Sequence, residues 1–573
     1  MSNILPIRTN YYFQGEINPH DLTLLKTWVE QLEKETPKTT LELDEFLNKV
    51  DELNHKIRDT GGEIYIKMTC DTIDKKIVED YTAFQQNISA YYAPKDFAFK
   101  NIVLNSPALK DWVVEHGKTG SLLERILKND SDLFREENVA LEIKENELGI
   151  EYRSITGSMT VEFNGEEKTL PEMAIFLKDK DRNVREKAWR VRSEKMLTHK
   201  DELNVLFNKL YELRQEIAKN AGFDNYRDYM HQAKGRFSYT VQDIHNFHDA
   251  VESEIMPLIA ELNQKRKDTL QIDNLKPWDM SVSLDGKLLK PVKKTEDLIP
   301  KHITMMQQID PIFGENFSSM DASKLLDLFN RKNKAPGGYS YPLYKYGASF
   351  IFMNAVGLHS DLTTLIHEIG HAMHEFAQAD HKYSSLLGLP MEAAELASMS
   401  MEMISMDRWK ECYTDKEDFR KAKYDQIEGA LKFFPWCMTI DSFQQKIYTD
   451  SGTTELREQA FIDVMDRFSN KAGLNWSGLE QERAIQWLFQ LHIFEVPFYY
   501  IEYGIAQLGA LAVYREYKQN PKIAVENYKK FLNIGHQVPL ADIYKIAGIE
   551  LKFTKEYIRE LVQFVREELK ELS

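Results

Sequence analysis

The sequence has few cysteines and no long apolar run. Its 573 residues include only three cysteines, Cys70, Cys412 and Cys437, which lie far apart. An odd number of widely spaced cysteines excludes a disulfide framework and is typical of free thiols in a reducing cytoplasm. No stretch of about 18 uninterrupted apolar residues is present, so we expect no membrane-spanning helix.

Positive charge is also in short supply. The chain has 73 Lys and Arg residues against 90 Asp and Glu residues, which gives a formal net charge of −17. Such a protein would repel a phosphate backbone, so nucleic acid is not an expected partner. Residues 1–10 lack a positive region followed by an apolar run, so we expect no secretory signal and a cytoplasmic protein.

Hydrophobic spacing predicts a chain that is mainly α with a small β-sheet. Apolar residues recur at three and four positions in several segments, which is typical of amphipathic helices. The pair Gly61-Gly62 is expected to break one of them. The predicted helices cover residues 21–35, 41–59, 74–92, 185–198, 200–221, 241–266 and 558–572.

Two shorter segments are predicted to be extended. Alternating residues from Ile150 to Phe163, followed by the turn pair Asn164-Gly165, predict a β-hairpin within residues 149–172. Residues 349–354 predict a strand directly before a histidine-rich helix. As an edge strand it would pair with an extended peptide through main-chain hydrogen bonds, whereas a central strand would only build the core, and the sequence is compatible with both.

The histidine-rich helix carries an H-E-x-x-H pattern at residues 367–371. Asp361 offers a cap, and apolar residues from Leu362 to Met373 supply one buried face. Residues four apart lie on the same side of a helix, so His367 and His371 are able to bind one metal ion, and Glu368 is able to reach a water on it. Zinc suits such ligands. It would also lower the pKa of bound water and polarise a carbonyl. The alternative is a histidine pair that makes ordinary hydrogen bonds in a buried helix.

A catalytic zinc needs a third protein ligand, and a second helix over residues 391–402 offers one. Glu392 and Glu395 are both candidates, and small residues around Glu395 favour it because they let two helices approach closely. Glu402 either holds a ligand histidine by its other ring nitrogen or faces solvent. His374 is about 10 Å along the helix axis from His367, too far to share the ion, and is expected to support the site or line a cleft.

A late segment, residues 494–503, is dense in aromatic residues. Tyr499 and Tyr503 are four apart and would share a helix face, with Tyr500 as a rival. Amide hydrolysis passes through a tetrahedral oxyanion, and one well-placed donor stabilises it by roughly 3 kcal/mol. The alternative is a set of core aromatics whose hydroxyls bond to the backbone.

Three stretches, residues 364–374, 394–402 and 498–504, together resemble the thimet oligopeptidase and oligoendopeptidase F group of zinc peptidases, most closely oligoendopeptidase F. The resemblance runs from about residue 149 to the C-terminus. It implies a gluzincin-type, two-lobed helical body around a deep substrate channel. We expect a helical N-terminal region over residues 1–190, with the hairpin near 149–172, and a zinc peptidase catalytic domain over residues 191–573.

The resemblance also implies roles for single residues. One zinc ion per chain would be held by His367, His371 and Glu395, and Glu368 would be the general base. Further catalytic donors to the oxyanion would be His492, Tyr499 and Tyr503.

We therefore predict a soluble zinc endopeptidase that cleaves internal bonds of short, unstructured peptides. Two alternatives stay open: a zinc exopeptidase that acts as a carboxypeptidase or aminopeptidase, and a non-catalytic peptide-binding protein. No nucleic-acid or membrane partner is expected, and no oligomeric state is predicted.

Overall fold

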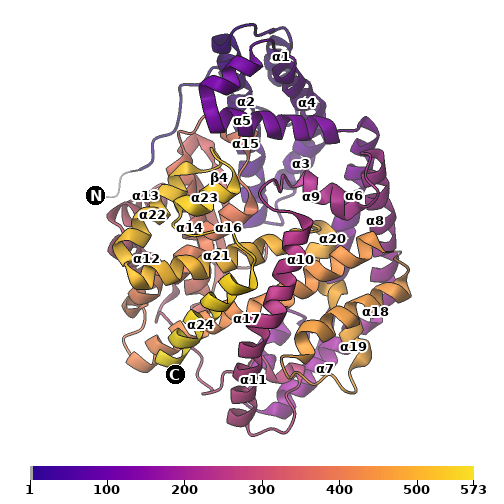
Figure 1. The fold of residues 1–573 in the computed structure, drawn as a ribbon, viewed down its shortest axis with the longest axis vertical. Helices are drawn as coiled ribbons and strands as arrows, with labels where there is room; N and C mark the ends of the chain where they lie inside the picture. The colour runs from indigo at the N-terminus through magenta and orange to yellow at the C-terminus, as the bar shows by residue number, and fades with distance from the viewer. Residues whose placement is uncertain (1–3, 451) are drawn as a thin grey trace. The chain divides into compact units, whose positions relative to one another are not determined.

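The computed structural model describes residues 4–450 and 452–573 (Figure 1). The chain is mostly helical and carries two small sheets, as predicted. It divides into two compact units. The first unit comprises Met1–Asp132, Leu289–Lys423 and Ala506–Leu551, and the second comprises Leu133–Leu288, Tyr424–Ile505 and Lys552–Ser573. None of the helices within the described ranges is long and apolar enough to span a bilayer.

The first unit combines helices from three parts of the chain with a three-stranded sheet. Its elements are α1 (Thr23–Glu33), α2 (Thr40–Cys70), α3 (Lys75–Ala83), α4 (Ala90–Leu104), α5 (Leu109–Leu133), α12 (Leu298–Ile309), α13 (Pro311–Ala322), β3 (Leu326–Phe329), β4 (Tyr339–Leu343), β5 (Ala348–Ala355), α14 (His359–Gln378), α15 (Ser384–Leu387), α16 (Met391–Ser405), α22 (Pro521–Ile534) and α23 (Leu540–Ile546).

The second unit is helical apart from one hairpin. It contains α6 (Glu136–Gly157), β1 (Thr160–Phe163), β2 (Glu166–Thr169), α7 (Arg182–Thr198), α8 (Lys200–Asn220), α9 (Tyr226–Ala233), α10 (Val241–Ala250), α11 (Met256–Leu270), α18 (Thr454–Met465), α19 (Glu480–Ala484), α20 (Leu491–Glu495) and α24 (Lys555–Glu571). The chain changes unit within two long helices, α17 (Lys416–Thr449) and α21 (Tyr500–Gln519). The predicted boundary at residue 190 stays a prediction.

The predicted strand over residues 349–354 is β5, and it is the central strand of its sheet. The order is β3-β5-β4, with β3 parallel and β4 antiparallel to β5. Every residue of β5 except Asn354 is buried. The core-strand alternative is therefore confirmed, and the edge-strand alternative is wrong for β5 because both of its sides are already paired. An edge of this sheet belongs to β4.

The predicted break at Gly61-Gly62 is wrong, because α2 continues through both glycines. A Cβ on Gly61 would lie 2.6 Å from the ring of Phe84, and one on Gly62 would lie 2.2 Å from the ring of Tyr341. The glycines therefore allow two aromatic rings to touch the helix. Ring packing outweighs the cost of about 1 kcal/mol that a helical glycine carries.

The predicted hairpin is confirmed in part. Strands β1 and β2 pair around Asn164-Gly165, whose φ angles of 56° and 82° suit a tight hairpin turn. The strand expected from Ile150 to Ser154 is wrong, because these residues belong to α6. Leu148 and Tyr152 are both buried, and their four-residue spacing is helical. The alternation over residues 150–154 was too short to distinguish a strand from a helix.

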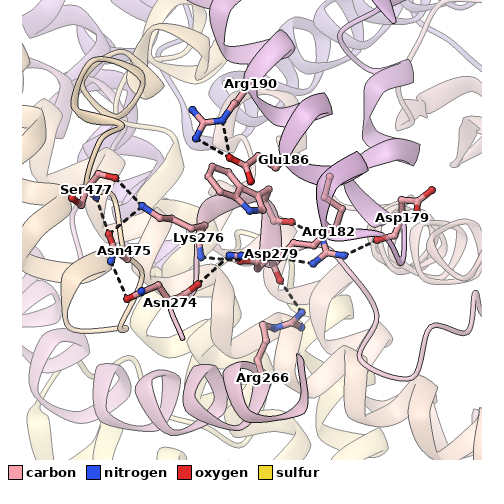
Figure 2. A network of polar contacts seen from close by, with 12 residues as sticks. Asp179, Arg182, Glu186, Arg190, Arg266, Asn274, Lys276, Asp279, Asn475 and Ser477 are labelled. Atoms are coloured by element: carbon pink, nitrogen blue, oxygen red, sulfur yellow. Dashed lines mark hydrogen bonds and ion pairs between the residues drawn. The ribbon is translucent and has the colours of Figure 1, made fainter. Parts of the chain in front are cut away.

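One buried carboxylate fixes a loop of the second unit to α7 (Figure 2). The Asp279 side chain is fully buried and accepts a bidentate pair of hydrogen bonds from Arg182, at 2.9 and 2.8 Å. Arg185, 2% exposed, donates a third bond at 3.0 Å. Burial by itself would raise the pKa of Asp279, but these donors lower it overall, so the group is held as an anion. The loop is thereby tied to the helix by charge as well as by packing.

Helices α14 and α16 of the first unit lie side by side (Figure 1). They approach closely at Gly370, where an added Cβ would lie 2.6 Å from the Cα of Ser398 and 3.0 Å from the carbonyl oxygen of Ala397. No side-chain rotation relieves such a contact, since both atoms are backbone. Glycine at this position is therefore what permits the spacing of the two helices.

We predict that Gly370→Ala lowers the free energy of unfolding by roughly 1–3 kcal/mol, the usual cost of overpacking. Thermal unfolding followed by circular dichroism measures it. Gly429→Ala is the matched control: Gly429 is an exposed residue inside α17 with no atom within 4 Å of an added Cβ. That variant should be neutral or gain up to about 1 kcal/mol from helix propensity. Equal melting temperatures for the two variants would contradict the packing argument.

Candidate metal centre

The H-E-x-x-H pattern lies on α14, which begins at His359, two residues before the expected cap. Asp361 still organises the helix start, because one carboxylate oxygen accepts the backbone N–H groups of Val356, Gly357 and Leu358 at 2.6–2.8 Å. The predicted apolar face, from Leu362 to Ile369, is buried. The remaining face carries the two histidines.

Helix α16 brings Glu395 to these histidines. One oxygen of the Glu395 carboxylate, Oε2, lies 3.3 Å from Nε2 of His367 and 3.6 Å from Nε2 of His371. The two imidazole rings have centroids 4.9 Å apart and are nearly perpendicular, at 83°. Among the described residues these three side chains form the one group whose histidine, cysteine or carboxylate atoms converge as metal ligands would. Glu392 is buried but is not part of it.

The three ligand atoms fit a zinc ion. Zinc binds histidine nitrogen and carboxylate oxygen at 2.0–2.2 Å in tetrahedral geometry, which separates neighbouring ligand atoms by about 3.4 Å. The observed separations of 3.3 and 3.6 Å bracket that value. Two histidines and one glutamate also form a donor set that leaves the fourth position of a tetrahedron open.

Further side chains hold the ligands in place. Glu402, seven residues after Glu395, has an oxygen 2.7 Å from Nδ1 of His367. The Glu402 carboxylate accepts a hydrogen bond from Nδ1–H of His367, which turns Nε2 toward Glu395. The Ser398 hydroxyl donates to Oε2 of Glu395 at 3.2 Å. Glu402 therefore bonds His367, as one of the two interpretations of the sequence expected.

Charge is concentrated at this group. Burial by itself would lower the pKa of His367, but hydrogen bonds and charge from Glu395 and Glu402 raise it overall. Burial would likewise raise the pKa of Glu395, and the two histidines lower it instead. The Glu395 carboxylate, held ionised beside the imidazoles, supplies negative charge of the kind that a divalent cation requires.

Glu368 has a different environment. It is 6% exposed, and burial raises its pKa to about 7, with Glu395 and Glu402 adding to the effect and His367 opposing it. A carboxyl group that titrates near neutral pH is able both to accept and to return a proton. His374, by contrast, is 2% exposed and packs against Phe531 of α22, with ring centroids 5.2 Å apart, outside the ligand group.

The late aromatic residues form a cluster within the second unit. His492 lies on α20, and its ring centroid is 4.7 Å from that of Tyr500 and 6.0 Å from those of Tyr499 and Tyr503. Tyr503 in turn lies 4.9 Å from Tyr499 and 5.8 Å from Tyr500. The four predicted residues are thus neighbours, and Tyr499 and Tyr500 are equally members of the cluster.

The turn before α21 is strained and held from two sides. Phe498 has a φ of 60°, which is uncommon for a bulky residue. Its N–H donates to the side chain of Gln444 at 2.9 Å, and its carbonyl accepts from buried Arg236. Arg236 also pairs with buried Glu502 at 2.8 Å. These contacts fix the start of α21, which carries Tyr500 and Tyr503 and which Tyr499 directly precedes.

Sequence reasoning missed several of these supporting residues. Ser398 is one of the small residues around Glu395, and its local pattern does not indicate that its hydroxyl donates to the Glu395 carboxylate. Arg236 and Gln444 are more than 50 residues before Phe498, so no local pattern links them. Their signal is burial of a polar side chain, which only the folded chain reveals.

Comparison with known proteins agrees with this geometry. The model of Peptidase family M3 matches residues 175–563. An oligoendopeptidase F homolog of Borreliella burgdorferi is 23% identical over 566 residues, covering 92% of this chain and 91% of the relative. Oligopeptidase PepF of Bacillus subtilis is 22% identical, covering 77% of this chain and 68% of the relative. The solved structure of PZ peptidase A with inhibitor 2 matches with a TM-score of 0.88 at 25% identity, over 97% of this chain and 98% of that one.

The family match covers more than half of the chain, and the relatives confirm the predicted resemblance to oligoendopeptidase F. The chain belongs to peptidase family M3 and is a metallopeptidase.

Proposed function

We propose that this metallopeptidase is a zinc endopeptidase that cleaves internal bonds of short, unstructured peptides. The observation that carries the proposal is the convergence of His367, His371 and Glu395 at separations of 3.3 and 3.6 Å, which suit one tetrahedral zinc ion per chain. Relatives named oligoendopeptidase F and oligopeptidase support the peptide substrate.

Bound zinc would polarise the scissile carbonyl and make water acidic enough to be deprotonated near neutral pH. Glu402 keeps the Nε2 lone pair of His367 directed at the ligand position, and Ser398 orients the Glu395 carboxylate. Glu368 takes the proton of the attacking water and delivers it to the leaving amine. The Glu368 carboxyl group is buried and has a pKa raised to about 7, which suits both transfers.

We assign to His492, Tyr499 and Tyr503 the donation of hydrogen bonds to the oxyanion, with Tyr500 as the rival donor. A phenol O–H and an imidazole N–H are both suitable donors for a developing negative charge. The rigid start of α21, held at Phe498, supports this role because preorganised donors need no rearrangement during the reaction.

Strand β4 is the element to which we assign the substrate backbone. It is an edge of the β3-β5-β4 sheet, and an extended peptide is able to add to such an edge by main-chain hydrogen bonds. Gly338, directly before β4, lies against Thr364 of α14, where an added Cβ would be 3.6 Å from the threonine methyl group.

All the assigned residues fall in the predicted catalytic domain, 191–573. Free thiols at all three cysteines fit the cytoplasm as the compartment.

The direct test combines metal analysis with peptide cleavage. We expect about one zinc per chain, cleavage of an internally quenched ten-residue peptide, loss of cleavage on chelation and recovery on adding zinc. Product masses should show internal cuts. Removal of single terminal residues would favour an exopeptidase, and an uncut peptide bound to zinc-loaded protein would favour a binding protein.

Replacing the proposed base should separate chemistry from metal binding. Glu368→Gln removes the proton acceptor but keeps the side-chain volume, so we expect kcat to fall by at least about 10²-fold with zinc content unchanged. Glu568→Gln, at another buried glutamate on α24, is the control and should keep its kcat. Near-normal turnover of Glu368→Gln would remove Glu368 from the role.

The bond between Glu402 and His367 should tune zinc affinity. We expect Glu402→Ala to weaken zinc binding by about 10–100-fold, as loss of a histidine's hydrogen-bond partner usually does. Competition with a chelator of known affinity measures it. Glu402→Gln keeps an oxygen that accepts a hydrogen bond from Nδ1–H of His367, so it should recover most of the zinc affinity. Wild-type affinity in the alanine variant would argue that the contact is dispensable.

A further inference from the structure

His492 is bonded to a chain of two polar side chains within the second unit. The indole Nε1 of Trp436, on α17, donates to Oε1 of Gln490 at 2.9 Å. The amide Nε2 of Gln490 lies 2.7 Å from Nδ1 of His492. One glutamine therefore connects a tryptophan to the histidine of the aromatic cluster.

The direction of these bonds follows from the chemistry of the first one. An indole nitrogen is a donor only, so the atom of Gln490 that faces Trp436 must be the amide oxygen. The amide nitrogen then faces His492, and it is also a donor only. Nδ1 of His492 must accept, so it carries no proton. In a neutral imidazole the proton is then on Nε2.

The other ring nitrogen is available for a ligand. Within residues 4–450 and 452–573, Nε2 of His492 has no hydrogen-bond partner, and the side chain is half-buried. Burial lowers the pKa of His492 to about 4, so the ring is neutral near neutral pH and only one nitrogen bears a proton. The titratable groups around it are the tyrosines 499, 500 and 503, with the Lys234 ammonium 5.1 Å from the centre of the Tyr499 ring.

We propose that Trp436 and Gln490 are positioning residues that hold His492 as the Nε2–H tautomer, so that it presents a donor to the oxyanion. This inference rests on the role proposed above for His492. The opposite tautomer would present a lone pair to the oxyanion, which is repulsive. Because the indole can only donate, it sets the direction of both hydrogen bonds, so the partly buried Trp436–Gln490 contact has a role beyond packing.

The first measurement uses the full-length, zinc-loaded protein with ¹⁵N-labelled histidine. The ring signals of His492, assigned by their loss in His492→Gln, should show an unprotonated Nδ1 and a protonated Nε2. A protonated Nδ1 with a bare Nε2 in the wild type would overturn the proposal without any further variant.

The variant Gln490→Glu exchanges donor and acceptor only in the bond between residue 490 and Nδ1 of His492. A glutamate still accepts the indole N–H of Trp436, but toward Nδ1 of His492 it also accepts and so attracts a proton there. The nearby carboxylate also raises the pKa of His492. Below that pKa the imidazolium still donates from Nε2; above it, the neutral ring keeps its proton on Nδ1 and Nε2 is bare.

We therefore expect kcat of Gln490→Glu to fall, relative to the wild type, as pH rises through this new ionisation. The loss should reach about 10²-fold, the scale for one oxyanion donor, with KM changed far less. The ¹⁵N signals should show the tautomer change over the same pH range. A kcat ratio that does not vary with pH would overturn the proposal, since a purely structural defect would lower activity at every pH.

A separate control isolates the role of His492 itself. If His492→Gln keeps the kcat of the wild type, the proposed role of the histidine fails, whereas the wild-type ¹⁵N spectrum still decides the tautomer. Trp436→Phe keeps the ring and removes only the indole donor, so Gln490 becomes free to turn over. We expect a mixture of His492 tautomers in that variant, and a pure Nε2–H signal would show that Trp436 does not set the direction.

Discussion

The candidate metal centre depends on how closely α14 and α16 approach each other at Gly370. Any larger residue would meet the backbone of Ala397 and Ser398, and the second helix would have to move away. Glu395 is one turn before Ser398 on that helix, so its carboxylate would move as well. A ligand set with atoms 3.3–3.6 Å apart tolerates only small displacements. A backbone contact at one glycine thus controls the geometry of a site made from side chains.

The surroundings of each acidic group then determine its pKa. Glu395 is kept anionic by two imidazoles, whereas Glu368, one residue after His367, has a pKa raised to about 7 by burial. Under the proposed function, these surroundings would assign one glutamate of the site to metal binding and the other to proton transfer. Asp279 shows the same dependence on surroundings at a structural site, where Arg182 and the buried Arg185 keep it charged.

Local periodicity predicted the parts of the structure that local geometry determines. The spacing of His367 and His371 follows from one helical turn, and small residues around Glu395 indicated a close contact between its helix and the histidine-rich helix. The hairpin turn at Asn164-Gly165 was found for the same reason, since its backbone angles depend on its own two residues. The motifs also carried the resemblance that the family match later confirmed.

Features that depend on distant partners were beyond the reach of such patterns. Gly61 and Gly62 looked like a break because the rings of Phe84 and Tyr341 that pack on them lie elsewhere in the chain. Strand β5 is central only because β3 and β4 pair with it. Gln490 belongs to no sequence motif. The role we propose for it depends on its hydrogen bond with Trp436 of α17, which is distant in the sequence.

The central claim is that one zinc ion is held by His367, His371 and Glu395. Anomalous diffraction at the zinc absorption edge, from crystals of catalytically active, zinc-loaded protein, tests it directly. The predicted result is one strong peak about 2.0–2.2 Å from Nε2 of both histidines and from the Glu395 carboxylate. Active crystals with no peak at this position, or with their zinc bound elsewhere, would contradict the account.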